Sequence, residues 1–345
     1  MKLGIIGLPG AGKSTLFEAL TKIIQEDTTH KPEDRLGTIK VPDDRVNRLS
    51  SMYNPKKTIY AQIEYLLPYI AAQKPGHKSD EAAWTTVRTC DALIQVLRNF
   101  EGYGGETPTP LEDFNRLNEE MIFADLLVVE KRLERLALDS KRGKKADPEE
   151  VRLLTECKEM LEKEKPLRHN PELAAAKQLK GFTFLSGKPM LILFNNPEDS
   201  ENIPDTGETL AGEKFLAIRG DLEHELAQMD ENEAEEYLLE YGISTSAMDR
   251  MISLSYELLG LISFFTVGPD EVRAWTIKKD TVAVDAAEVI HSDIKKGFIR
   301  AEVVAYDDLM EAGSYKEARN RGTVRLEGKT YPVQDGDIIE FRFNV

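Results

Sequence analysis

No stretch of this 345-residue sequence approaches the roughly 18 apolar residues that a membrane-spanning helix needs. The apolar run at residues 1–6 is too short for a signal peptide, and glycine-rich sequence follows it at once. The composition, 41% hydrophobic and 31% charged, is typical of a globular protein in water. We therefore expect no membrane contact and a location in the cytoplasm.

Cysteine and positive charge are also in short supply. The only cysteines, Cys90 and Cys157, lie far apart, so they offer neither a metal-binding pair nor a disulfide framework. We expect two reduced thiols in a core or on a helix. The net charge is −16, so the chain as a whole repels a polyanion such as RNA. Any contact with nucleic acid must therefore use a local basic patch.

Short apolar segments alternate with helical ones in the first two thirds of the chain. We predict a helix over residues 13–24 and an irregular stretch over residues 25–60, which three prolines interrupt. Buried or half-buried strands are predicted at residues 2–6, 58–67, 92–97, 190–194 and 215–218. This alternation favours an α/β fold with a parallel sheet and helices on both faces.

Charged helical sequence interrupts this pattern. Leu126, Val129, Leu133 and Leu136 recur at steps of three and four, and a second apolar stripe follows the polar turn at residues 141–148. The pattern predicts an inserted helical hairpin at residues 111–180. A protruding coiled-coil arm and an ordinary packed helix pair are both compatible with it, and the high charge favours the arm.

The last part of the chain has short strand signals around Gly and Asp-Gly turns. We predict a compact α+β domain at residues 263–345, after a first domain at residues 1–262.

One motif carries specific chemistry. Residues 7–14, Gly-Leu-Pro-Gly-Ala-Gly-Lys-Ser, match G-x-x-x-x-G-K-[ST] between a predicted strand and a predicted helix. Backbone N–H groups and the helix N-terminus would bind phosphates, Lys13 would reach the β- and γ-phosphates, and Ser14 would coordinate Mg²⁺. The predicted phosphate site comprises Gly7, Pro9, Gly10, Ala11, Gly12, Lys13, Ser14 and Thr15.

The base site is less sharply marked. Asn195, Asn196 and Glu198 follow the strand at residues 190–194, where GTPases usually have Asn-Lys-x-Asp. A longer acidic side chain pairs less well with guanine, so the pattern favours ATP over GTP, or weak discrimination. A plain strand-to-loop turn would also explain Asn and Pro at this place.

Together these motifs resemble the YchF or Obg-like ATPases, a branch of the translation-factor GTPase class. The similarity is densest at residues 264–277, 290–301 and 333–345, and the Asn-x-x-Glu signature is shared. The resemblance implies a P-loop NTPase domain with a coiled-coil arm. It also implies a carboxy-terminal TGS domain, a ubiquitin-like β-grasp fold, and a ribosome or RNA partner contacted through the TGS domain and the arm.

The departures from the family concern hydrolysis. Where the family has Asp-x-Ala-Gly, the sequence has Tyr65-Leu-Leu-Pro68, with no carboxylate to hold Mg²⁺ water. The glycine run of the next loop and the family's proposed catalytic histidine are also missing, and the first switch around His30–Gly37 is short. A replacement group could lie in the altered loop, in or near which His77, Asp80, Glu81 and Glu64 are found, and the catalytic residues stay unknown.

Because phosphoryl transfer depends on positioning and charge stabilisation, these losses predict a protein that binds ATP or GTP but hydrolyses it slowly or not at all. The alternatives are an active ATPase with rerouted residues, and an interaction module with a structural nucleotide. The predicted TGS domain has cations that could contact RNA or belong to a mixed-charge surface: Lys295, Lys296, Arg300, Lys316, Arg319, Arg321, Arg325 and Lys329.

Overall fold

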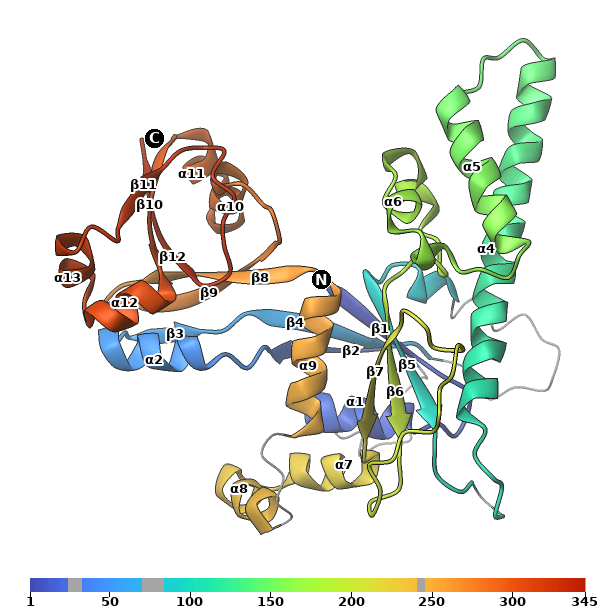
Figure 1. Cartoon of the computed structure of the whole chain (residues 1–345), viewed down its shortest axis with the longest axis horizontal. Helices are drawn as coiled ribbons and strands as arrows, with labels where there is room; N and C mark the ends of the chain where they lie inside the picture. The colour runs from blue at the N-terminus through green and yellow to red at the C-terminus, as the bar shows by residue number, and fades with distance from the viewer. Residues whose placement is uncertain (24–32, 70–83, 103, 241–245, 345) are drawn as a thin grey trace. The chain divides into compact units, whose positions relative to one another are not determined.

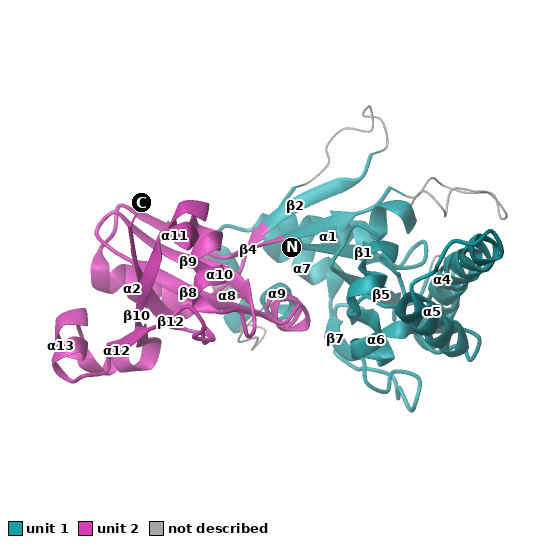
Figure 2. Ribbon diagram, turned by 90° about the horizontal axis from the view of Figure 1, so that it is seen from above, with its two compact units in different colours: residues 1–38, 64–251 teal, residues 39–63, 252–345 magenta. Residues whose placement is uncertain are grey.

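The computed structural model describes residues 1–23, 33–69, 84–102, 104–240 and 246–344. It divides into two compact units, one of residues 1–38 and 64–251 and the other of residues 39–63 and 252–345 (Figure 2). This division differs from the predicted domain boundary at residue 262 in two respects, since residues 252–262 and residues 39–63 both belong to the second unit. Residues 39–63 group with the carboxy-terminal segment, because β3 (Lys57–Ile59) pairs with β9 (Glu271–Lys278).

A six-stranded sheet in the order β2-β4-β1-β5-β6-β7 forms the centre of the first unit (Figure 1). The strands β1, β5 and β6 match their predicted positions, and the pairings β4–β1, β1–β5, β5–β6 and β6–β7 are all parallel. The strand bounds are β1 Lys2–Ile6, β2 Arg35–Lys40, β4 Gln62–Leu67, β5 Ala92–Arg98, β6 Met190–Asn195 and β7 Lys214–Ile218. The predicted α/β class is confirmed.

The predicted irregular stretch at residues 25–60 is the main error of the sequence analysis. It contains β2, β3 and the helix α2 (Asp44–Tyr53), whose N-cap Asp43 accepts a hydrogen bond from the backbone N–H of Arg45. The single strand predicted at residues 58–67 is two strands, β3 and β4, which belong to different sheets.

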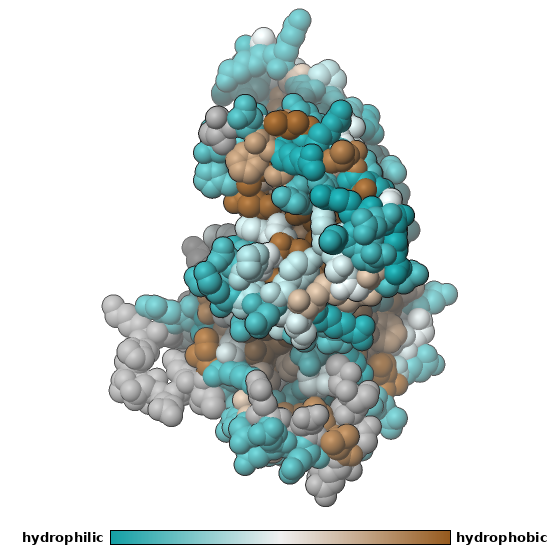
Figure 3. All heavy atoms as spheres, turned by 90° about the vertical axis from the view of Figure 1, so that its left-hand side faces the viewer, coloured by the Kyte–Doolittle hydropathy of each residue, from teal (hydrophilic) through white to brown (hydrophobic). Residues whose placement is uncertain are grey.

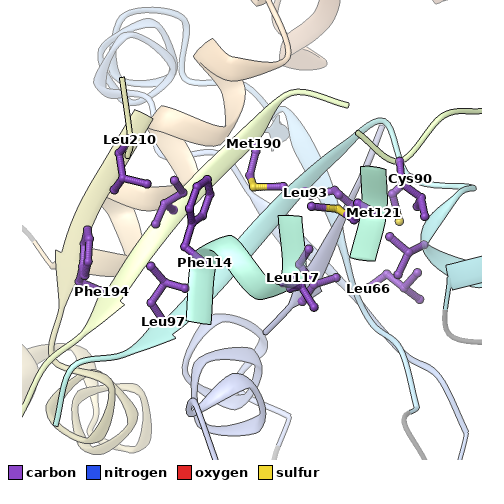
Figure 4. Close-up of a cluster of buried hydrophobic side chains, with 14 residues drawn as sticks. Leu66, Cys90, Leu93, Leu97, Phe114, Leu117, Met121, Met190, Phe194 and Leu210 are labelled. Carbon is purple, nitrogen blue, oxygen red and sulfur yellow. The ribbon is translucent and has the colours of Figure 1, made fainter. Parts of the chain in front are cut away.

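The helical hairpin is present. The helix α4 (Pro110–Lys141) packs its first half on the central sheet, where Phe114, Leu117 and Met121 lie against Leu93 and Leu97 of β5 (Figure 4). Its second half packs against α5 (Pro148–Leu161) through a separate apolar seam. The turn between the two helices lies at residues 142–147, far along the hairpin from the sheet (Figure 1).

A buried carboxylate fixes the base of this hairpin. Asp125 of α4 has no exposed surface and accepts hydrogen bonds from the backbone N–H groups of Leu185 and Ser186 at 3.0 and 2.7 Å. The Ser186 hydroxyl and the Arg88 guanidinium also donate to it, at 2.8 and 2.9 Å. Because all four donors come from outside α4, this side chain joins the helix to two other segments.

The remaining helices of the first unit follow its strands. The helix α1 (Lys13–Thr21) packs against α7 (Gly220–Gln228), and α8 (Glu231–Glu240) follows α7. The helix α9 (Ala247–Leu258) spans the division between the units at residue 251. Short helical turns precede β6: η1 Leu167–His169, α6 Pro171–Ala174 and η2 Lys177–Phe182.

The second unit has its own six-stranded sheet, in the order β11-β10-β12-β8-β9-β3. Its carboxy-terminal part is the predicted α+β fold, with α10 packed on one face of the sheet over a core that includes Phe264 and Phe298. The element bounds are β8 Leu261–Val267, α10 Ala283–Ile290, α11 Ser292–Lys296, β10 Phe298–Ala305, α12 Tyr306–Ala312, α13 Tyr315–Asn320, β11 Arg325–Glu327 and β12 Asp337–Phe343.

Apolar side chains on the face drawn in Figure 3 are scattered among hydrophilic ones. Among the helices that the structure describes, none has the length and apolarity that a membrane crossing requires. Cys90 and Cys157 are both free and buried, as predicted.

Candidate phosphate-binding site

The glycine-rich turn joins the end of β1 to the start of α1. Gly10 and Gly12 have left-handed backbones, with φ of 80° and 93°, and Gly12 is the N-cap of α1. A Cβ on Gly12 would lie 2.2 Å from Nδ2 of Asn195, and a Cβ on Gly7 would lie 2.5 Å from the Val96 carbonyl oxygen. Glycine is therefore required at positions 7 and 12 by close neighbours, and at position 10 by backbone conformation.

Lys13 lies over this turn. Its Nζ donates hydrogen bonds to the carbonyl oxygens of Gly7 and Leu8, at 2.9 and 2.8 Å. Burial lowers the pKa of Lys13 to about 8. An anion that replaced these neutral carbonyls would stabilise the charged ammonium, so the lysine is placed to exchange backbone contacts for a phosphate.

The other predicted phosphate residues occupy the same turn. Pro9 and Ser14 are exposed, Thr15 is half-buried, and the N–H of buried Ala11 donates to the Leu8 carbonyl at 3.3 Å. The hydroxyl of Ser14, in the first turn of α1, is an oxygen ligand suited to Mg²⁺. The described residues contain no cluster of three or more His, Cys, Asp or Glu that could hold a metal on its own.

Asn195 connects three segments at the edge of the turn. Its Nδ2 donates to the Ala11 carbonyl at 3.1 Å, and its Oδ1 accepts from the N–H of Gly220 at 2.9 Å. The side chain thus ties the end of β6 to the glycine turn and to the start of α7. Asn195 was predicted to bind the base, but in the structure its side chain supports the glycine turn.

Asn196 is buried and holds its own loop closed. Its Nδ2 donates to the carbonyls of Ser200 and Asn202, at 3.2 and 2.8 Å, and its Oδ1 accepts from Nδ2 of Asn99 at 2.7 Å. Glu198 is exposed on the same loop. Of the three residues predicted to bind a base, Glu198 therefore presents its side chain to solvent, while the two asparagines bond to protein. The sequence analysis missed Asn99, for which it had no motif.

The segment predicted to replace the family's Asp-x-Ala-Gly lies beside the glycine turn. In the parallel pairing of β1 and β4, Leu3 is opposite Tyr65 and Gly4 is opposite Leu66, so Leu67 lies next to the end of β1. Tyr65 is fully buried, and residues 65–69 include no acidic side chain.

Glu64 lies at the wrong end of the sheet for catalysis. It is opposite Lys2, about 16 Å along the strand from the level of Gly7 at ~3.3 Å per residue. His77, Asp80 and Glu81 lie outside the described residues, as does part of the stretch His30–Gly37.

The structure does bring one carboxylate to the end of β4. Asp34 accepts a hydrogen bond from the backbone N–H of Tyr69 at 2.8 Å and another from the Thr86 hydroxyl at 3.1 Å. Asp34 is exposed and comes from the segment before β2. No spacing in the sequence pointed to it, because the contact depends on the fold.

The strand, glycine turn and helix in a parallel sheet define the class of P-loop NTPase folds. Comparisons with known proteins then specify the family. A family model named YchF-GTPase_C, described as "Protein of unknown function (DUF933)", matches residues 261–344. The chain is 38% identical over 362 residues to the Ribosome-binding ATPase YchF of Bacillus subtilis, covering 99% of each chain. It is 33% identical over 360 residues to that of Escherichia coli O157:H7, covering 100% of this chain and 99% of the relative.

Solved structures agree. The Schizosaccharomyces pombe YchF GTPase superposes with a TM-score of 0.85 at 29% identity, covering 99% of this chain and 97% of that one. A GTP binding protein from Pyrococcus horikoshii OT3 has the same fold, with a TM-score of 0.61 at 19% identity and full coverage of both chains. The chain belongs to the YchF family.

Proposed function

We propose that this protein binds a nucleoside triphosphate, ATP or GTP, at the glycine turn, and that it is a ribosome-associated regulatory factor with slow or absent hydrolysis. The observation that carries the proposal is the arrangement of Lys13 over a turn whose glycines are required by Val96 and Asn195. Ser14 would supply a ligand to Mg²⁺. The ribosomal partner comes from the relatives, whose names call them ribosome-binding ATPases.

Slow hydrolysis is proposed from the chemistry beside the turn. The residues at the end of β4, Tyr65 to Tyr69, offer no carboxylate to hold Mg²⁺-bound water. Pro68 has no N–H to give to a γ-phosphate. Nucleotide binding can therefore persist while hydrolysis is slow, because the glycine turn holds the phosphates whereas neighbouring segments position the attacking water.

The loop after β6 bears on the choice between ATP and GTP. Glu198 is an exposed acidic side chain on the loop after β6, one methylene longer than aspartate. We propose that it discriminates weakly or favours ATP. Asn195 and Asn196 would shape the base site through the backbone and loop that they hold.

Calorimetric titration with ATP, GTP and their diphosphates, with and without Mg²⁺, tests this proposal. Wild-type protein should bind triphosphate, and the variant Lys13→Ala should lose binding while its thermal unfolding stays unchanged. Equal nucleotide affinity of wild type and variant would refute the assignment. Equal affinity for diphosphate and triphosphate would refute the regulatory role, because a ligand shifts a conformational equilibrium only when it binds the two states with different affinity.

One observation favours a second candidate, an active ATPase with rerouted residues. Asp34 brings a carboxylate to the backbone of Tyr69, just past the end of β4. Single-turnover phosphate release separates the two candidates. Release that is rapid in wild type and lost in Asp34→Asn would favour the active ATPase, and release that is slow in both supports the first proposal.

A further inference from the structure

The parallel strands β8 and β12 of the second unit separate soon after they meet. In the described part of the chain, their pairing is confined to Ile338 opposite Phe265. Beyond this point β8 continues to Val267 and β12 to Phe343, and β12 rises toward the C-terminus while β8 lies across the view (Figure 1). We call the opening between residues 266–269 and residues 339–343 the strand fork.

A cavity of about 460 Å³ occupies the strand fork. Small-ligand and peptide pockets commonly have volumes of roughly 300–1,000 Å³. Residues 266–269 line one side of the cavity, and residues 338–341 and 343 line the other. Because consecutive side chains of a strand point to opposite faces, a cavity lined by four consecutive residues of β12 lies beside the strand and reaches both faces of the sheet.

The edge of β12 that faces this cavity has no paired strand along most of its length. On its other edge β12 pairs with β10 throughout, from Asp337 opposite Ala305 to Phe343 opposite Phe298. Main-chain N–H and C=O groups of a strand point alternately to its two edges, so some of those in residues 339–343 point into the fork. An extended peptide can pair with such an edge and join the sheet as an added strand.

One face of the strand fork is apolar. Ile339 and Phe341 of β12 belong to the core that α10 covers, and Ile290 and Ile294 line the cavity beside them. Phe343, at the end of the strand, is 44% exposed. Side chains that an added strand directs to this face would therefore have to be apolar.

The opposite face carries an unneutralised carboxylate. Tyr315 donates to Glu302 at 3.1 Å, and Glu302 is opposite Glu340 in the register of β10 and β12, so Tyr315 and Glu340 share this face. Glu302 is paired with Arg319 and Arg342. For Glu340, which is exposed, no ion pair is found among the residues that the structure describes.

Two tyrosines lie beside this carboxylate. Burial raises the pKa of Tyr315 to about 12, and the charges of Glu340 and Tyr53 act in the same direction, which makes these three side chains neighbours. The hydroxyl of Tyr53 is buried and has no hydrogen-bond partner within the described ranges. A carboxylate without a counter-ion next to aromatic rings suits an ammonium or guanidinium group, which the carboxylate pairs with and the ring faces attract.

We propose that the strand fork binds an extended peptide in which apolar and basic residues alternate. Paired with the free edge of β12, such a peptide directs every second side chain toward Ile294 and Phe341, and the others toward Glu340. A phosphate-rich ligand is disfavoured because it would be repelled by Glu340. An apolar small molecule would leave both this carboxylate and the strand edge unpaired.

Fluorescence polarisation of a labelled peptide, acetyl-Val-Lys-Val-Lys-Val-amide, with the full-length protein at low salt tests this inference. Two matched peptides separate its parts. Acetyl-Val-Glu-Val-Glu-Val-amide reverses the charge and keeps the apolar residues. A version of the basic peptide that is methylated on its backbone nitrogens keeps every side chain and loses the N–H donors that a strand needs.

The basic peptide should bind at least about tenfold more tightly than either matched peptide, because each of them lacks one of the two kinds of contact. Glu340→Gln should weaken its binding about threefold to fivefold and reduce the salt dependence. Phe343→Ser, at a partly exposed position, should weaken it about fivefold through lost apolar contact. Asp307→Asn removes an exposed carboxylate of α12 in the same unit and should stay within about twofold of wild type.

Thermal unfolding and nucleotide titration check the fold of each variant, and the comparison of the three peptides needs wild-type protein alone. Absence of binding by the basic peptide would overturn the inference. So would equal binding of the acidic peptide, which excludes recognition by Glu340, or of the methylated one, which excludes pairing as a strand. Equal losses in Glu340→Gln and Asp307→Asn would show that only net charge matters. None of these outcomes bears on nucleotide binding at the glycine turn, which belongs to the first unit.

Discussion

Nδ2 of Asn99 donates a hydrogen bond of 2.7 Å to Oδ1 of Asn196, and joins the residue after β5 to the residue after β6. The backbone supports the same link, because the N–H of Asn99 donates to the Asn195 carbonyl at 2.8 Å. Asn99 also donates to the Asn202 carbonyl at 3.2 Å. The loop that carries Glu198 is thus held from a neighbouring strand, which makes Asn99 a positioning residue for the proposed base site.

Replacement of Asn99 should therefore separate base binding from phosphate binding. The variant Asn99→Ala leaves the buried Oδ1 of Asn196 without its donor, which costs about 1–3 kcal/mol. We expect a loosened loop and weaker ATP affinity, with unchanged affinity for inorganic tripolyphosphate, because the glycine turn is untouched. Calorimetry with both ligands measures the split, and Asn115→Ala on the exposed side of α4 serves as control. Parallel losses for the two ligands would indicate a general effect on the fold.

The glycine turn offers a matched pair of substitutions. Gly10 and Gly12 have similar left-handed backbones, so alanine strains both by about 1–2 kcal/mol. At Gly12 alone the new Cβ would meet Nδ2 of Asn195 at 2.2 Å, whereas nothing lies within 4 Å at Gly10. Urea unfolding without nucleotide should show a clearly larger loss for Gly12→Ala than for Gly10→Ala. If the two losses match, Asn195 moves aside freely and is not fixed by Ala11 and Gly220.

A third prediction concerns the anchor of the arm. In Asp125→Asn, the amide oxygen can still accept hydrogen bonds, but the NH₂ group faces donors. Because Leu185 and Ser186 donate to different oxygens of Asp125, one of these two buried N–H groups loses its partner. Breaking one side of a buried ion pair costs about 3–5 kcal/mol, and we expect a loss near the lower end because one acceptor remains. Urea unfolding measures it. Glu149→Gln, which removes an exposed pair with Arg152, should have little effect. A small loss at both sites would mean that Asp125 does not fix the hairpin.

The elements with strong local signals were predictable from the sequence. The apolar runs at β1, β5 and β6 and the helical stripes of α4 and α5 carry their own periodicity, so they appear where the pattern places them. The stretch of residues 25–60 failed because its prolines were taken to mark irregular structure. Pro42 precedes the N-cap Asp43 of α2, and Pro55 follows its C-cap Asn54, so these two prolines flank a helix.

The candidate site divides in the same way. The glycine turn and Lys13 follow from a contiguous motif, and in the structure the turn leads into α1 with Lys13 bonded to the Gly7 and Leu8 carbonyls. Asn99 and Asp34 could not be predicted from the sequence, because each acts through a hydrogen bond to a residue far along the chain. Asn99 bonds to Asn196, and Asp34 bonds to Tyr69. Glu64 shows the opposite case. It is near residues 65–68 in sequence and was therefore considered as a replacement catalytic group, but the strand register places it opposite Lys2, at the far end of β1 from the glycine turn.

The last prediction uses the buried ammonium of Lys13. Its pKa of about 8 in the free protein means that the proton is held at neutral pH and lost as the pH rises above 8. A bound triphosphate stabilises the charged form and raises this pKa, so binding above pH 8 takes up a proton. Affinity should then fall by up to about tenfold for each pH unit above 8, until the pKa of the complex is reached.

Calorimetry of triphosphate binding between about pH 7 and pH 9.5, above the ordinary titration range of histidine and carboxylates, measures this dependence. The variant Lys13→Arg supplies the control, because a guanidinium stays charged throughout and its affinity should be flat with pH, even if it is weaker overall. A pH dependence that persists in Lys13→Arg would assign the titration to another group. A wild-type affinity that stays flat above pH 8 would show that the Lys13 ammonium keeps its proton without a phosphate despite its burial, held by the hydrogen bonds that it donates to the carbonyls of Gly7 and Leu8.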